Sequence, residues 1–191
     1  MKCLFIPFAT ISGYETGANI SAKDISRSAE IYLKNLCVAA VSAKINGTKD
    51  CSDTEIAVVT NFEIPDAYRT VLETNNIKII NCPFNTFNFG AKYKWSLAFY
   101  KLCALKFMYE EYDYEYLAFV DADVFVQDSL KNIWLEAKSA ILLYDIVHGL
   151  QVKCYTDFLN EVNQFMELGM ITHRGGEFFA ANRDNCNKFI G

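Results

Sequence analysis

Two aspartates one residue apart, Asp121 and Asp123, are the side chains in this sequence that are best placed for chemistry. They directly follow residues 116–120, an apolar and aromatic run rich in β-formers that predicts a buried strand. In open α/β sheets, ligands bind at the carboxyl ends of the strands, because loops line the crevice there. Two carboxylates beside an apolar wall need compensating charge. A divalent cation that prefers oxygen ligands would supply it.

The segment DADVFV, which begins at Asp121, resembles the DxD element of GT-A glycosyltransferases that use nucleotide sugars. Upstream, residues 99–103 (FYKLC) resemble the lysine-bearing helix that precedes this element in glycogenin-like members. The resemblance is close over roughly the middle third of the chain, and elsewhere it extends only to the order of elements. It implies an α/β fold, a single Rossmann-like GT-A domain whose mostly parallel central sheet is flanked by helices.

The resemblance also implies a reaction. A metal ion, Mn²⁺ or Mg²⁺, would bridge the phosphates of a nucleoside-diphosphate sugar, with a UDP-sugar favoured, and the sugar would move to a hydroxyl of a carbohydrate or glycoprotein acceptor. Asp123 would bind the metal directly, and Asp121 would share the ion or hold ribose and sugar hydroxyls. Lys101, with Lys94 as second choice, would stabilise the departing diphosphate. The alternative is that both lysines are solvated helix residues.

The loop that follows the first predicted strand is a candidate for donor binding. In the GT-A family this loop receives the base and ribose, so the resemblance makes Thr10, Ser12 and Tyr14 candidates. The alternative is an ordinary solvated loop between a strand and a helix. The loop contains neither the phosphate-binding Gly-rich pattern with Lys-Ser/Thr nor the G-x-G-x-x-G fingerprint. Nucleoside triphosphate hydrolysis and dinucleotide binding are therefore disfavoured.

A second candidate cluster lies near the carboxyl end of the sequence, at Gly175, Gly176 and Glu177. The two glycines permit a tight or left-handed turn before an apolar strand. An inverting enzyme needs a carboxylate to take the acceptor's proton, and Glu177 suits that role, whereas a retaining enzyme needs no base there. Otherwise the segment is a turn into an edge strand with a surface glutamate. His173 is a candidate for a further metal ligand, although a lone histidine is more often structural.

Alternating strand and helix patterns predict the sheet that must position these residues. The helices show apolar residues at helical spacing, and the strands are short runs of β-formers. Strands are predicted at 3–8, 55–60, 77–82, 116–120, 139–147 and 178–181, and helices at 25–44, 65–73, 91–110, 127–138 and 155–168.

Composition limits the class of protein. The 191 residues are 52% hydrophobic, which predicts one α/β domain, either a minimal protein or one domain of a longer one. The net charge of −5 and the absence of a Lys/Arg block argue against a nucleic-acid partner. No run reaches about 18 apolar residues, so we expect no transmembrane segment.

The cysteines suggest a compartment. There are 7 of them, scattered and never in a Cys-x-x-Cys pair. Most lie in apolar segments, which favours buried, reduced thiols and a cytoplasmic location.

Three other functions fit parts of the pattern. Phosphatases of the haloacid dehalogenase type also carry two aspartates after a strand, but near the start of the chain, with Thr or Val where this sequence has Phe125. A nucleotidyltransferase would need a Gly-rich, Arg-containing loop after the first strand. A non-catalytic carbohydrate-binding relative of the GT-A fold would keep the architecture and lose the metal-bound donor.

Overall fold

The computed structural model describes residues 1–10, 25–90, 96–145 and 174–191, with side chains for all of these except residues 25–29, 145 and 174. In these ranges the strands are β1 (Lys2–Phe8), β2 (Thr54–Thr60), β3 (Lys78–Asn81), β4 (Tyr116–Val120), β5 (Leu142–Asp145) and β6 (Arg174–Asn182). The α-helices are α1 (Ile25–Ser42), α2 (Asp66–Thr74), α3 (Tyr100–Glu111), α4 (Lys131–Ala137) and α6 (Arg183–Ile190). A π-helical turn, η1 (Ala43–Gly47), extends α1, and a 3-10 turn, η2 (Ser96–Phe99), precedes α3.

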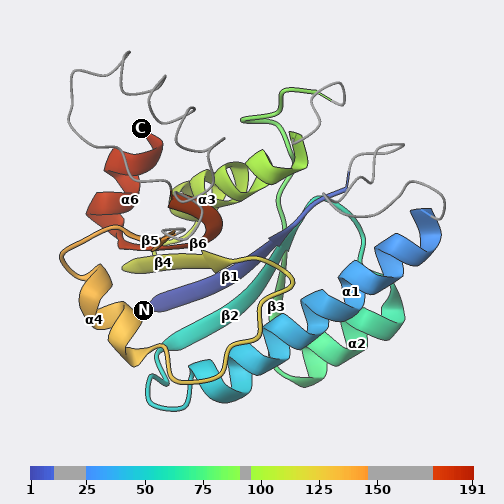
Figure 1. Ribbon diagram of the computed structural model, residues 1–191, viewed down its shortest axis with the longest axis horizontal. Coiled ribbons are helices and arrows are strands. Elements are labelled where there is room, and N and C mark those ends of the chain that lie inside the picture. The colour runs from blue at the N-terminus through green and yellow to red at the C-terminus, as the bar shows by residue number, and fades with distance from the viewer. Residues whose placement is uncertain (11–24, 91–95, 146–173) are drawn as a thin grey trace, which may run out of the picture.

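The described strands form one mixed sheet in the order β3-β2-β1-β4-β6-β5. The first four of these strands pair in parallel, and β6 runs antiparallel to both β4 and β5. The predicted α/β class with a mostly parallel sheet flanked by helices is confirmed (Figure 1).

The central strands are buried on both faces, as parallel strands covered by helices should be. Along β1, Leu4 and Ile6 pack into the core on the side of α1 and α2, whereas Cys3 and Phe5 pack into the core beneath α3 and α6. All four side chains are 0% exposed. This alternation follows from the two-residue period of a strand, and it explains why β1 reads as a continuous apolar run. Figure 1 shows the two helical layers on opposite faces of the sheet.

The helical layers change sides where the strand order reverses. The chain proceeds from β1 outward to β2 and β3 with α1 and α2 on one face. It then crosses through α3 on the other face and returns to place β4 on the free side of β1. The strand order therefore reverses between β1 and β4, and ligands of open α/β sheets bind at such a point.

Some boundaries differ from the sequence prediction. The helix expected at 127–138 begins only at Lys131, because the preceding backbone is engaged elsewhere: the Leu130 N–H donates to the Gly47 carbonyl over 2.9 Å, and the Val126 carbonyl accepts from Asn46 Nδ2 over 2.8 Å. A Cβ at Gly47 would lie 3.0 Å from Leu130 Cδ1, so a glycine allows this close approach.

The Gly175-Gly176 turn was a wrong expectation. Both glycines lie inside β6, and β6 pairs on both sides, with β4 and with β5, so it is not an edge strand either. A register shift between Leu143 and Tyr144 marks the place where β5 meets the glycines. Three predictions lie outside the described residues: the helix at 155–168, the end of the strand at 139–147 and the start of the helix at 91–110.

Candidate functional site

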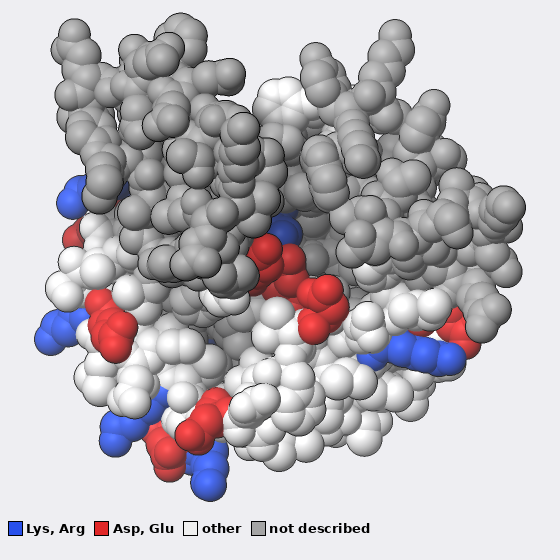
Figure 2. All heavy atoms as spheres, viewed as in Figure 1, with Lys and Arg blue, Asp and Glu red and all other residues white. Residues whose placement is uncertain are grey.

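The carboxyl ends of β1 and β4 meet at the point where the strand order reverses, and Asp121 is the first residue after β4. Its N–H donates to the Glu177 carbonyl over 3.0 Å, and its own carbonyl accepts from the Val124 N–H over 3.3 Å, which closes a turn. The ladder with β6 therefore fixes the place of Asp121, and the turn carries Asp123 outward. Figure 2 shows acidic side chains grouped near the middle of this face, beside a basic one.

Asp121 is the inner of the two carboxylates. Its Oδ1 lies 2.5 Å from Lys101 Nζ, and the two side chains are 23% and 22% exposed, respectively. Burial raises the pKa of Asp121; the charge and hydrogen bonding of Lys101 oppose the rise, and the negative charges of Asp123 and Glu177 add to it. The net direction is upward, which shows that this carboxylate is held in a place that disfavours its charge.

Lys101 bridges two strands from the helix above them. Besides its ion pair with Asp121, its Nζ donates to the Gly176 carbonyl over 3.0 Å. Its place is set by the packing of α3, whose neighbouring residues Tyr100 and Cys103 are buried. The ammonium therefore lies where β4 and β6 adjoin, with a carboxylate on one side and a peptide oxygen on the other.

Asp123 is the outer carboxylate. It is exposed, and it makes no ion pair with any other residue that the structure describes. Burial raises the pKa of the Tyr32 phenol, and the charge of Asp123 adds to that rise. Tyr32 comes from α1 and its ring lies 6.5 Å from that of Phe8, at the end of β1. The outer carboxylate is therefore close enough to α1 to act on the phenol of Tyr32, whereas the inner one pairs with Lys101.

The remaining predicted residues divide into two groups. Thr10 is held at the end of β1 by two hydrogen bonds with the Asn61 carboxamide, one donated by the Thr10 N–H over 2.9 Å and one accepted by its carbonyl over 2.8 Å. Glu177 is exposed and near enough to Asp121 to affect its pKa, while Gly175 is buried. Ser12, Tyr14, Lys94 and His173 lie outside the described residues.

Several solved structures have a fold similar to that of this chain. The chain is similar to the galactosyltransferase LgtC, in complex with donor and acceptor sugar analogs, at 17% identity and a TM-score of 0.55, covering 98% of this chain and 60% of LgtC. It is also similar to mouse xyloside xylosyltransferase 1, at 12% identity and a TM-score of 0.59, covering 98% of this chain and 69% of the mouse protein.

The fold is that of the GT-A glycosyltransferases. No family model matches the sequence. No curated protein matches it either. The chain spans about 60% of the length of LgtC, so activity, substrates and partners are matters for proposal.

In this GT-A fold the described carboxylates suit a metal that arrives with phosphate better than a bare ion. Among the described residues no group of three His, Cys, Asp or Glu side chains could hold a metal. Asp121 and Asp123 offer two carboxylates, and Mg²⁺ is commonly bound by one or two carboxylates together with substrate phosphates. The donor set therefore fits a cation whose other ligands are diphosphate oxygens and water.

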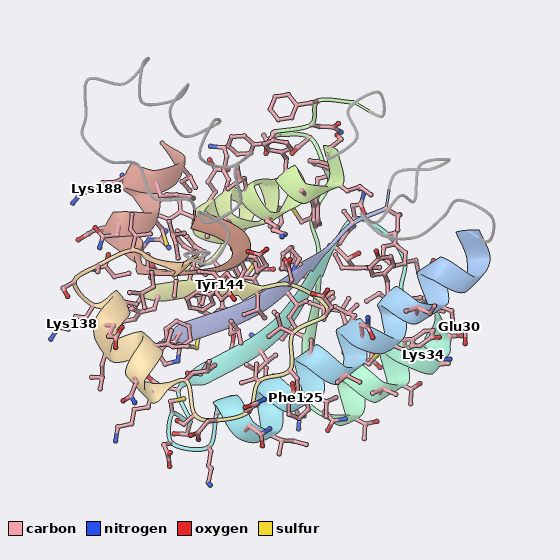
Figure 3. All side chains as sticks on the ribbon, viewed as in Figure 1. Glu30, Lys34, Phe125, Lys138, Tyr144 and Lys188 are labelled. Atoms are coloured by element: carbon pink, nitrogen blue, oxygen red, sulfur yellow. The ribbon has the colours of Figure 1, made fainter. Side chains whose placement is uncertain are left out.

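Sequence reasoning missed three residues near this site. Asn61 directly follows a strand that ends at the same edge, which was a usable signal. No signal in the sequence pointed to Tyr32, because its nearness to Asp123 depends on where α1 packs. Tyr144 pairs with Gly175 across the β5 to β6 ladder and is 47% exposed (Figure 3). An exposed aromatic beside a glycine offers a flat surface of the kind that packs against sugar rings.

A separate hollow lies at the ends of β2 and β3. Its volume is about 420 Å³, and its lining includes Asn61, Phe62, Arg69 and Asn81 but neither Asp121 nor Asp123. We assign the chemistry to Asp121 and Asp123, because they follow β4 at the strand-order reversal, whereas the hollow lies at the ends of β2 and β3.

Within the described residues, no helix is long and apolar enough to cross a membrane.

Proposed function

We propose that this chain is a metal-dependent glycosyltransferase that moves a sugar from a nucleoside diphosphate to a hydroxyl of a carbohydrate or glycoprotein. One observation carries the proposal: Asp121, Asp123 and Lys101 come together where β1 and β4 end, at the strand-order reversal of a GT-A fold. The two carboxylates supply the cation ligands, and the lysine supplies a positive charge for phosphate. A non-catalytic relative would have no need of this combination.

In the proposed reaction the bond between the anomeric carbon and the diphosphate oxygen breaks, and a bond from that carbon to the acceptor oxygen forms. A bound Mn²⁺ or Mg²⁺ would offset the charge that the leaving diphosphate gains. Lys101, released from Asp121, would donate to the same phosphate oxygens. Asp123 would hold the metal directly, and Asp121 would share it or hold the ribose and sugar hydroxyls.

If the reaction inverts the anomeric centre, we propose that Glu177 acts as the base that takes the proton of the acceptor hydroxyl. The exposed carboxylate stands at the start of the strand that contacts Asp121, so an acceptor can reach it from solvent. Gly176 is exposed and leaves the adjoining surface without a side chain, which gives a sugar room to approach, and the buried Gly175 precedes it in β6. Thr10, and with it Ser12 and Tyr14 in the same loop, would contact the nucleoside, and Lys94 would assist Lys101.

We also propose that the protein is located in the cytoplasm. The six described cysteines are all free and buried, which suits a reducing, cytoplasmic setting. We treat the chain as one domain, alone or within a longer protein.

The test is thermal unfolding with uridine, guanosine and thymidine diphosphates and their sugars, each with and without Mn²⁺. At about 100 times its Kd, a ligand adds about 2.7 kcal/mol of stability, which raises the Tm by about 5 to 10 °C. We expect this rise for one nucleotide, with uridine the first expectation, and only when Mn²⁺ is present. Asp123→Asn should unfold at the same temperature as the wild type without ligand and lose the rise.

The proposal fails if no nucleotide stabilises the protein in a metal-dependent way. Stabilisation by a free sugar alone would instead favour a carbohydrate-binding module. Release of phosphate from a sugar phosphate, without any nucleotide, would favour the phosphatase alternative.

A further inference from the structure

Lys101 already neutralises the inner carboxylate in the described structure. Its Nζ lies 2.5 Å from Asp121 Oδ1 and donates to the Gly176 carbonyl over 3.0 Å. Both charged side chains are largely screened from water, at 22% and 23% exposed. The helix that carries Lys101 is packed against the sheet, since Tyr100, Cys103 and Ala104 beside it in the sequence are buried.

A divalent cation that approaches Asp121 alone must therefore displace a positive charge. Like charges repel more strongly where water is partly excluded than they do in open solvent. The described residues provide no third acidic, histidine or cysteine ligand to compensate. A bare cation is left with Asp123, an exposed carboxylate, and single exposed carboxylates bind such ions weakly.

A cation that carries a diphosphate does not face this repulsion unaided. The diphosphate brings negative charge, so the ammonium can exchange its carboxylate for phosphate oxygens without losing a charged partner. Asp121 then becomes available to the metal. The exchange needs only rotation of the lysine side chain, which is flexible and has three donors.

We propose that Lys101 is an internal counter-ion that keeps free divalent cations off Asp121, so that metal and diphosphate enter the site together. This inference rests on the proposed function, since it takes the ligand to be a metal nucleoside diphosphate. The competing interpretation is a permanent ion pair that only stabilises the fold, and it assigns Lys101 no effect on metal affinity.

The experiment measures binding of Mn²⁺ alone, with no nucleotide, from the electron paramagnetic resonance signal of the free ion. Lys101→Met removes the charge and keeps the length of the side chain. We expect it to bind Mn²⁺ at least about tenfold more tightly than the wild type, because removing a like charge at this range is worth one or more powers of ten. The matched control is Lys106→Met, about one and a half turns further along α3, where the lysine pairs with Glu110 over 2.6 Å. Its affinity should equal that of the wild type.

A second variant keeps the test decisive if Lys101→Met does not fold. Lys101→Met/Asp121→Asn removes both charges of the pair, and it should bind free Mn²⁺ within about twofold of the wild type, since the intact pair offers the ion no net charge. Equal Mn²⁺ affinity in Lys101→Met and wild type would overturn the proposal. So would a tenfold loss in Lys101→Met/Asp121→Asn, because it would mean that Asp121 binds the free ion in the wild type. These outcomes leave the nucleotide test untouched, so failure of the counter-ion and failure of the glycosyltransferase assignment are told apart.

Discussion

The two aspartates of the site differ in environment although they stand one residue apart. Asp121 is mostly buried and ion-paired, whereas Asp123 is exposed and close enough to the phenol of Tyr32 to act on it. The difference comes from the backbone, because the ladder with β6 holds Asp121 and a turn carries Asp123 beyond it. Two identical side chains thus acquire different tasks through position alone.

At the residue scale, Glu177 has a role that can be tested apart from metal binding. We expect Glu177→Gln to lower sugar transfer by about 10²- to 10⁴-fold, which is the usual contribution of a positioned general base. Because Glu177 is exposed, its loss should leave the stability and the nucleotide-dependent rise in Tm unchanged. Transfer is measured as nucleoside diphosphate released in the presence of acceptor.

The control is Glu136→Gln, an exposed glutamate on α4, which should keep full transfer. Full transfer by Glu177→Gln would place the base elsewhere or indicate a retaining reaction.

At this scale the sequence predicts residue types better than it predicts contacts. The apolar strand followed by two aspartates led to the carboxyl edge of the sheet, where both aspartates lie. Lys101 was named from a family resemblance, and the structure brings it to Asp121. Nothing in the sequence indicates that the same ammonium would reach the Gly176 carbonyl, because that contact depends on how a helix and two strands pack.

At the element scale, α6 begins with a side-chain cap that also connects it to α4. The Asn182 side-chain oxygen accepts from the Asn185 N–H over 2.8 Å, and its Nδ2 donates to the Lys138 carbonyl over 2.8 Å. Arg183, the next residue, donates to the carbonyls of Tyr109 and Tyr112 near the end of α3. The helix that carries Lys101 is thereby connected to the last strand of the sheet.

We expect Asn182→Ala to lower the free energy of unfolding by about 1 to 2 kcal/mol, since it removes a cap and a second hydrogen bond. Asn182→Asp keeps the cap acceptor and loses only the donor, so it should cost less. Urea unfolding of the two variants measures the difference.

For comparison, Asn75→Ala removes a single exposed hydrogen bond at the end of α2 and should change stability by no more than about 0.5 kcal/mol. If Asn182→Ala were no worse than Asn75→Ala, the cap would not stabilise α6.

The elements themselves were largely predictable, because buried strands and helices have distinct apolar periods. The boundaries that failed did so for tertiary reasons. Residues before Lys131 could have continued the helix, but their backbone groups bond to η1, the turn that extends α1. Gly175 and Gly176 suggested a turn by local preference, but both lie in β6, where Gly175 pairs with Tyr144 of β5 beside a register shift.

At the scale of the whole molecule, the two ends of the sheet have different tasks. The carboxyl edge holds the candidate site. The amino edge holds a charged network in which Glu55, at the start of β2, accepts from Lys78 Nζ over 2.7 Å and from the Tyr114 hydroxyl. This network joins the starts of β2 and β3 to the approach to β4, and it has no part in the proposed reaction.

The amino-edge network predicts a pH dependence of stability. Burial would raise the pKa of Glu55, but the hydrogen bonds from Lys78 and Tyr114 and the charge of Lys78 outweigh it, and the net pKa lies below the ordinary value of 4.5. The ionised carboxylate therefore stabilises the fold above that pH, and this contribution is lost as the pH falls through the lowered pKa. We expect Glu55→Gln to show a shallower loss of Tm than the wild type below about pH 5.

Glu110→Gln, which removes an exposed helix pair with Lys106, is the control and should follow the wild-type curve more closely. Identical acid curves for Glu55→Gln and the wild type would remove Glu55 from the acid response.

The position of β6 between β4 and β5 has a consequence for synthesis on the ribosome. Strand β6 is the last of the described strands to emerge, yet it supplies the only hydrogen-bonding partner that β4 has on that side. Until it emerges, the nascent chain presents an open strand edge flanked by Leu117 and Phe119, and such edges favour aggregation. Translation that stops short of β6 would thus leave an aggregation-prone fragment, not merely a less stable protein.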